Sequence, residues 1–265
     1  MTEGPTEGGT SPLRGRVAVV TGVSRRVGIG FAVASRLAAL GADLFLHDFA
    51  PFDADQPWGA DPEGVGPLAQ DLRNVGARVE SIGADLGDAG APAAVMAAAV
   101  RAFGHIDIIV ANHAYSTLGT LEELTAEQVD RHLQVNVRGS LLLAQAFAAQ
   151  HVAPSGGRAV LMTSGQHLHP MPSELAYVAS KGALHQLTAS LAAHLAPRAI
   201  TVNAVNPGAT DTGYASPDVH AAVRAASPQG RWGRPEDAAR LIGWLCTDDA
   251  SWVTGQVINS TGGGP

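Results

Sequence analysis

Short apolar runs rich in β-branched residues alternate with longer Ala-rich segments along most of this chain. The strand-like runs are RVAVVTG (16–22), LFLHD (44–48), VESIGAD (79–85), IDIIVAN (106–112), RAVLMTS (158–164), AITVNAVNPG (199–208) and a final GQVIN. The segment GIGFAVASRLAALG has helical spacing, with Ile29, Val33 and Leu37 on one side. Strands separated by helices pair in parallel through right-handed crossovers, with helices on both faces. The pattern predicts an α/β chain with a single Rossmann-like, doubly wound parallel sheet of about seven strands.

The domain organisation is expected to be simple. Helical stretches are predicted at 88–103, 124–150 and 174–196, and a further helix is predicted to begin at Pro235. The opening MTEGPTEGGTSP is polar and lacks the basic start and apolar centre of a signal peptide. No internal repeat or linker divides the remainder. We expect a flexible tail over 1–14 and one domain over 15–265.

Composition excludes several classes of partner. Hydrophobic residues make up 46% of the chain and charged residues 15%, which supports a large core. The net charge of -7 argues against nucleic-acid binding, and no apolar run is long enough to cross a bilayer. The single cysteine, Cys246, lies in the helix-like LIGWLCT and is expected to be a buried, inert thiol. These features indicate a cytoplasmic protein with a small-molecule partner.

The stretch TGVSRRVGIG (21–30) joins the first predicted strand to the first predicted helix. Glycines there allow a sharp turn and let a pyrophosphate approach the helix N-terminus, where free N–H groups favour negative charge. A plain strand-to-helix turn is the alternative for a glycine motif alone, but the position in an alternating chain favours dinucleotide binding. The residues expected at the cofactor are Gly22, Ser24, Arg25, Arg26, Gly28, Ile29 and Gly30.

The motif YVASK places Tyr177 and Lys181 one helical turn apart, on the same helix face. A free tyrosine has a pKa of about 10, and a cation about 4 Å away is worth about three pKa units. The spacing therefore predicts a phenol whose pKa is lowered towards 7, where proton transfer is efficient. A solvated helix face is the alternative for this motif alone. Ser164 ends a strand thirteen residues earlier, and Asn136 lies in the preceding helical segment, as a core hydrogen-bonder or as part of a water relay.

Together these motifs resemble the short-chain dehydrogenase/reductase family over residues 15–262. The five-residue gap between Gly22 and Gly28 is similar to the long-loop branch of 3-oxoacyl-acyl-carrier-protein reductase-like proteins. The resemblance implies Tyr177 as general acid/base and Lys181 as its pKa modulator and ribose ligand. It implies Ser164 as the anchor of the substrate oxygen and Asn136 as a water relay. The further cofactor residues that it implies are Asp85, Leu86, Asn112, Pro207, Gly208, Thr210 and Thr212.

The implied activity is hydride transfer between a nicotinamide and a carbonyl or secondary alcohol carbon, with 3-oxoacyl-type ketone reduction first among the substrates. Enoyl-thioester reduction is the alternative activity. The spacing of Tyr177 and Lys181 argues against it, because enoyl-thioester reductases of the long-loop branch space their tyrosine and lysine more widely. A non-catalytic nucleotide-binding regulator is a further alternative. His113 and Ala114 replace the family's usual Ala-Gly, and Thr261 stands where an acid is common.

The choice of cofactor depends on opposing charges. Asp48 ends the second strand, where an acid accepts hydrogen bonds from the adenosine ribose and repels a 2′-phosphate. Arg25 and Arg26 oppose it, because two arginine–phosphate bonds offset one carboxylate; pairing with the pyrophosphate or with solvent is their other interpretation. The sequence favours NAD(H) through Asp48, with NADP(H) as the alternative.

On the substrate side, the expected pocket residues are Tyr115, Gln166, His167, Met171 and Tyr214. The segment that follows Thr212, GYASPDVHAAVRAASPQG, is interpreted as a mobile lid, and the acidic link 50–64 is expected near the adenosine end without a chemical role. His167 and His169 are predicted to be polar loop residues rather than metal ligands. The family resemblance also implies a homotetramer.

Overall fold

The computed structural model describes residues 11–152 and 156–264 and contains one parallel sheet. The strand order is β3-β2-β1-β4-β5-β6-β7, and every neighbouring pair is parallel. The predicted doubly wound sheet is therefore confirmed. The strands are β1 (Val17–Thr21), β2 (Asp43–Asp48), β3 (Val79–Gly83), β4 (Ile108–Ala111), β5 (Gly157–Met162), β6 (Ile200–Asn206) and β7 (Val257–Asn259).

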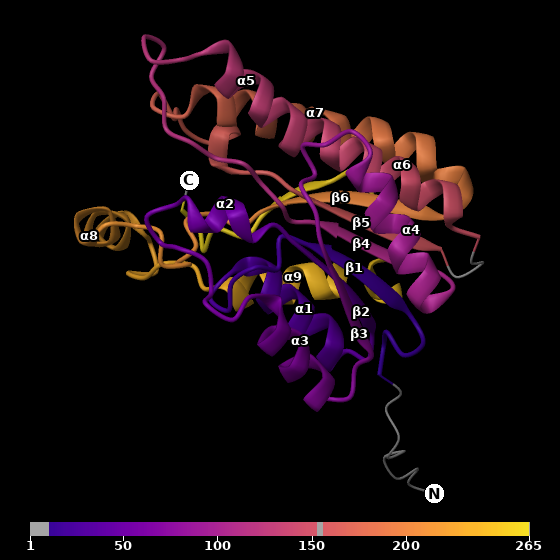
Figure 1. Cartoon of the computed structure of the whole chain (residues 1–265). Helices are drawn as coiled ribbons and strands as arrows, with labels where there is room; N and C mark the ends of the chain where they lie inside the picture. The colour runs from indigo at the N-terminus through magenta and orange to yellow at the C-terminus, as the bar shows by residue number, and fades with distance from the viewer. Residues whose placement is uncertain (1–10, 153–155, 265) are drawn as a thin grey trace, which may run out of the picture.

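Helices cover both faces of the sheet (Figure 1). One face carries α1 (Ile29–Ala39), α3 (Val65–Asn74) and α9 (Pro235–Leu245), and the other carries α4 (Ala91–Phe103), α5 (Ala126–His132), α6 (Ser140–Gln150) and α7 (Leu175–Leu195). Side chains of β1 divide between two cores accordingly: Ala18 and Val20 pack under α1, whereas Val17 and Val19 pack under α4 and α6. Burial on both faces is why the central strands β1 and β4 are continuous apolar runs, whereas the edge strand β3 is largely exposed.

The helical stretch predicted at 124–150 is interrupted. It begins with a capping box between Thr125 and Gln128, and α5 then passes into a π-helical turn over Leu133–Gly139 before α6. A π-helical turn carries an extra residue and is frequently found at functional sites. Here it contains the buried Asn136.

The packed chain begins earlier than predicted. Residues 1–10 of the predicted tail lie outside the described residues, but Leu13 is fully buried and its N–H donates to the carbonyl of Leu40 at 2.9 Å. The predicted boundary at residue 15 is therefore too late, because one leucine in a Gly- and Pro-rich run produces no periodic pattern. Cys246 is buried as predicted, and burial raises the pKa of its thiol to about 12.

The strand order reverses between β1 and β4, and ligands of such sheets bind beyond the carboxyl ends of the strands at this point. Two short helices lie near this end, α2 (Ala50–Ala54) in the link after β2 and α8 (Pro217–Ala226) in the segment interpreted as a lid (Figure 1). Among the described residues no helix has the length and apolarity needed to span a membrane.

Candidate functional site

Glycines at the end of β1 let the strand, the loop and α1 pack closely. Gly22 has a φ of +71°, and the carbonyl oxygen of Gly22 lies only 2.3 Å from where a Cβ would stand on Gly30. The side chain of Asn112 donates to the carbonyls of Thr21 and Gly22 at 3.0 and 3.1 Å, which joins the end of β4 to this loop. Larger residues at Gly22 or Gly30 would separate these elements.

The first helix begins without a side-chain cap at Gly28 and without an acidic residue in its first turn. Its first N–H groups are therefore suited to a bound anion. A cleft opens beside them, with apolar walls that include Ile29, Phe49 and Leu86. The predicted cofactor residues that line it are Gly22, Ser24, Arg25, Gly28, Ile29, Asp85, Leu86, Asn112 and Thr212. An anion-binding helix end beside apolar walls fits a dinucleotide.

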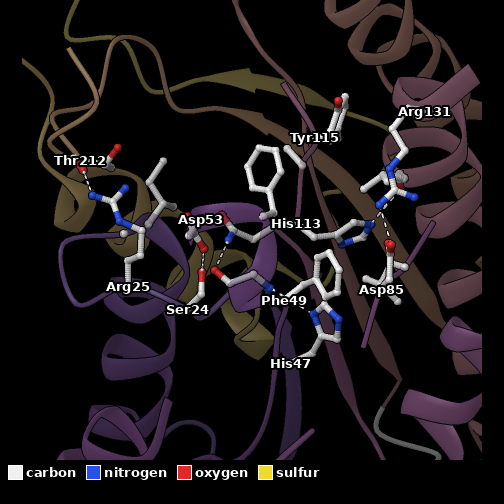
Figure 2. A pocket seen from close by; sticks show the side chains of 18 residues that line it. Ser24, Arg25, His47, Phe49, Asp53, Asp85, His113, Tyr115, Arg131 and Thr212 are labelled. Atoms are coloured by element: carbon white, nitrogen blue, oxygen red, sulfur yellow. Dashed lines mark hydrogen bonds and ion pairs between the residues drawn. The ribbon is translucent and has the colours of Figure 1, made fainter. Parts of the chain in front are cut away.

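The two arginines of the glycine stretch point in different directions. Arg25 lines the cleft, where it donates to the carbonyl of Thr212 at 2.9 Å (Figure 2). Its guanidinium also lies over the ring of Trp58. Arg26 does not line the cleft, because its guanidinium pairs with Asp71. The glycine stretch is thus held to the segment after β6 by one arginine and to α3 by the other.

Asp48 and three predicted cofactor residues after β6 do not line the cleft. Asp48 is not part of the cleft wall; burial raises the pKa of its carboxyl group, and the Ala50 amide that donates to it lowers the pKa. Pro207, Gly208 and Thr210 lie outside this wall as well, where the Thr210 hydroxyl donates to the carbonyl of Pro207 at 3.1 Å. Gly208 has a φ of +66°, and this turn leads the chain from β6 towards Thr212.

The proton-transfer residues meet at the start of α7. Lys181 is 2% exposed, and its Nζ lies 5.6 Å from the centre of the Tyr177 ring and donates to the carbonyl of Met162 at 2.9 Å. Ser164, just after β5, lies close enough to Tyr177 for its hydroxyl to lower the pKa of the phenol. The structure therefore brings Ser164, Tyr177 and Lys181 together from two elements.

The prediction that the pKa of Tyr177 is lowered is wrong for the protein without bound cofactor or substrate. Burial raises the pKa of Tyr177 to about 12, while the hydrogen bond with Ser164 lowers it. Burial also lowers the pKa of Lys181 to about 8. The Lys181 ammonium lies over the Tyr177 ring and donates to the Met162 carbonyl rather than to the phenol oxygen. The hydration that the phenolate loses on burial therefore outweighs its attraction to the ammonium.

Asn136 positions the wall of the cleft. Its side-chain oxygen accepts the N–H of Tyr115 at 2.7 Å, and its nitrogen donates to the Tyr115 carbonyl at 2.9 Å and to the Ser180 hydroxyl at 2.8 Å. The amide thus ties the loop after β4 to α7, one residue before Lys181. The water relay implied for Asn136 stays a prediction.

The predicted substrate residues are spread over several surfaces. Tyr115 lines the cleft, and Gln166 donates to Thr163 at 3.2 Å. His167 packs against His185, with ring centres 4.5 Å apart. Met171 is half-buried, and Tyr214 is half-exposed between the rings of Trp58 and Trp232. Within residues 11–152 and 156–264, no three His, Cys, Asp or Glu side chains are grouped to hold a metal ion.

Sequence reasoning missed a chain of rings that crosses the site. Phe52 of α2 contacts Tyr115, Tyr115 contacts His132, and His132 contacts Tyr177, with ring centres 5.4, 4.8 and 6.4 Å apart. His132 is fully buried; its Nδ1 donates to the carbonyl of Gln128 at 2.7 Å and its Nε2 accepts the N–H of Thr117 at 3.2 Å. The sequence signal that could have indicated His132 is its position one helical turn before Asn136, which places both on the same helix face.

In the sequence His113 stands out only as a departure from the family's usual residue. In the structure it joins β1 to the π-helical turn. It is buried between β1 and the π-helical turn, where Nδ1 lies 2.7 Å from the hydroxyl of Thr21 and Nε2 lies 3.2 Å from the carbonyl of Val135. Burial lowers its pKa to about 3, so it is neutral and joins these elements through hydrogen bonds. Phe52 and Asp53 of the link 50–64 also line the cleft, and further lining residues that the sequence did not indicate are His47, Phe49, Arg131 and Val135.

Comparisons with known proteins agree with this geometry. A family model described as Enoyl-(Acyl carrier protein) reductase matches residues 22–264. The chain is 38% identical to the uncharacterized oxidoreductase YjdA of Bacillus subtilis, over 94% of this chain and 96% of that protein. It is 33% identical to versicolorin reductase 1 of Aspergillus parasiticus, over 95% and 97% of the two chains. A short chain dehydrogenase from Burkholderia cenocepacia in complex with NADP superposes with a TM-score of 0.85 at 34% identity, covering 95% of this chain and 98% of that one.

Proposed function

Because the chain belongs to the short-chain dehydrogenase/reductase family, and is an oxidoreductase that acts with NAD(P), we propose that it reduces a ketone to a secondary alcohol. The observation that carries this proposal is the meeting of Ser164, Tyr177 and Lys181 beside the cleft. The nicotinamide, when bound, supplies the hydride.

Each residue of the triad has a separate task in the proposal. The Ser164 hydroxyl holds the substrate oxygen, and the Tyr177 hydroxyl donates its proton to that oxygen. The Lys181 ammonium, 5.6 Å from the ring, stabilises the phenolate that is left. Asn136 holds the Tyr115 backbone against α7 and so fixes the wall beside these groups.

The protonation of Tyr177 determines whether the site can donate a proton, and it does not set the equilibrium between ketone and alcohol. A pKa raised to about 12 by burial keeps the phenol protonated at neutral pH, which suits a proton donor. Alcohol oxidation needs the phenolate as a proton acceptor. At neutral pH the site without cofactor therefore holds the proton that ketone reduction consumes.

Two classes of ketone are proposed, and they differ in shape. A 3-oxoacyl thioester is the class suggested by the long glycine loop, whereas the similarity to a probable tetrahydroxynaphthalene reductase suggests a ketone derived from a hydroxylated aromatic polycycle. The ring of Tyr115 in the cleft wall favours the aromatic class, because aromatic faces and edges stack on planar substrates; His132 is fully buried behind it. The alternative of enoyl reduction has no comparable support from the Tyr177–Lys181 spacing.

An activity panel tests the proposal. NADH and NADPH oxidation is followed with 3-oxoacyl thioesters, hydroxylated aromatic polycyclic ketones, simple ketones and enoyl thioesters. We expect turnover with a ketone and at least one of the two cofactors. Turnover confined to enoyl thioesters, or binding of cofactor without turnover of any class, would contradict ketone reduction and favour the enoyl reductase or the regulator.

Assembly and location are proposed from the family resemblance. We expect a cytoplasmic homotetramer built through α6, α7 and the C-terminal strand; Trp252, 97% exposed just before β7, is the kind of side chain that a partner surface would cover. Size-exclusion chromatography with light scattering measures the mass, and the mass of a single chain would contradict the tetramer.

A further inference from the structure

Asp53 is a buried carboxylate in the wall of the cleft. It lies on α2, in the link after β2, and is 8% exposed. The hydroxyl of Ser24 donates to its Oδ2, and the indole N–H of Trp58 donates to its Oδ1 at 3.2 Å. Figure 2 shows Asp53 bonded to Ser24 of the glycine loop, in the same cleft as Arg25.

The charge of Asp53 is balanced by neutral donors alone. Among residues 11–152 and 156–264, none of the ion pairs includes Asp53, and each of its oxygens receives one hydrogen bond. A carboxylate oxygen accepts two bonds, so both oxygens retain capacity for further donors. A buried carboxylate of this kind favours a ligand with two hydroxyl groups and disfavours a second anion.

The other carboxylate near this end is less well placed. Asp48 is not in the cleft wall, and its carboxylate accepts the Ala50 amide at the start of α2. Asp53 in contrast is bonded to Ser24, two residues beyond Gly22. The apolar side chain of Phe49 lies in the same wall and offers a surface for a base.

Given the proposed function, which places a nicotinamide dinucleotide in this cleft, we propose that Asp53 is the residue that selects NAD(H) over NADP(H). Its free acceptor sites take the 2′- and 3′-hydroxyls of the adenosine ribose, and its charge repels a 2′-phosphate. Within residues 11–152 and 156–264 neither arginine forms an ion pair with Asp53, because the Arg25 guanidinium is directed to the Thr212 carbonyl and that of Arg26 to Asp71. The selecting carboxylate thus comes from α2 rather than from the end of β2.

Dissociation constants for NADH and NADPH, measured by calorimetry on the purified full chain, test this assignment. The wild-type protein should bind NADH at least about tenfold more tightly than NADPH. Asp53→Asn keeps an oxygen for Ser24 or Trp58 but removes the charge, and should shift the ratio towards NADPH by at least about tenfold. Asp55→Asn removes the same charge from the exposed side of the same link and should leave the ratio within about twofold.

Asp48→Asn is the rival variant. A shift in the ratio with Asp48→Asn and none with Asp53→Asn would overturn the assignment, as would a wild-type preference for NADPH; both results leave the proposed function standing. If Asp53→Asn does not fold, the binding of ADP-ribose and of 2′-phospho-ADP-ribose is compared for the wild type and for Asp48→Asn. Equal wild-type affinities contradict the assignment, and a preference for ADP-ribose that Asp48→Asn leaves unchanged supports it. Failure of the wild-type protein to bind any of these ligands would remove the proposed function, and the inference with it.

Discussion

Tyr177→Phe is expected to lower kcat/KM for ketone reduction by about 10³-fold while leaving the affinity for the cofactor within about twofold. Phenylalanine keeps the ring that contacts His132 and removes only the hydroxyl group that bonds Ser164. The loss should therefore fall on kcat rather than on cofactor binding. Steady-state kinetics and calorimetric titration with the preferred cofactor measure the two quantities.

The matched control for this variant is Ser190→Ala, which removes one hydroxyl group from an exposed position of the same helix. Its kcat/KM should stay within about twofold of wild type, as surface substitutions away from special contacts have small effects. If Tyr177→Phe retained a tenth or more of wild-type turnover, the tyrosine would not be the proton donor, and the proposed role of the triad would be lost.

Lys181→Met is expected to lower kcat/KM by about 10²- to 10³-fold and yet to stabilise the fold. Lys181 is the only lysine among the 17 basic residues of the chain, and its side chain is 2% exposed. Removing the ammonium removes the charge that stabilises the phenolate, worth about 4 kcal/mol at about 4 Å and less at the larger distance seen here. The methionine fills a similar volume in the same buried space.

The stability effect follows from the sign of the lysine's pKa shift. Burial lowers the pKa of Lys181 from 10.5 to about 8, so between these values the unfolded chain binds more protons than the folded one. The free energy of unfolding of the wild type therefore rises with pH across this window, and the penalty is full below pH 8. After the lost bond to Met162 is deducted, Lys181→Met should be about 2 kcal/mol more stable at pH 7.

Denaturant unfolding at pH 7 and at pH 10.5 measures this difference, which should shrink at the higher pH. Because the chain has one lysine, ¹⁵N-lysine labelling gives one Nζ signal whose titration reports the pKa directly. A titration midpoint near 10.5, or a variant less stable than wild type at pH 7, would show that the ammonium is not held at the expense of stability.

Much of the architecture could be predicted because it depends on local patterns. The apolar run of β1 is buried on both faces, and its alternate side chains enter two different cores, as a covered parallel strand requires. The glycines between 22 and 30 and the four-residue spacing of Tyr177 and Lys181 carry their consequences within one or two turns of chain. For the same reason Leu13 was missed, since its partner Leu40 is far away in the sequence.

What the sequence by itself determined is the family's sheet, the glycine-lined turn and the helix face that joins the phenol to the ammonium, because each follows from periodicity or from backbone freedom over a few residues. Only the tertiary structure decided the direction of the Tyr177 pKa, the neutral state of His132 between two tyrosines, and the place of Asp53 rather than Asp48 in the cleft wall. These features depend on how much hydration each group loses and on contacts between residues distant in the chain, such as Arg25 with Thr212. Neither the loss of hydration nor such contacts can be predicted from a local sequence pattern.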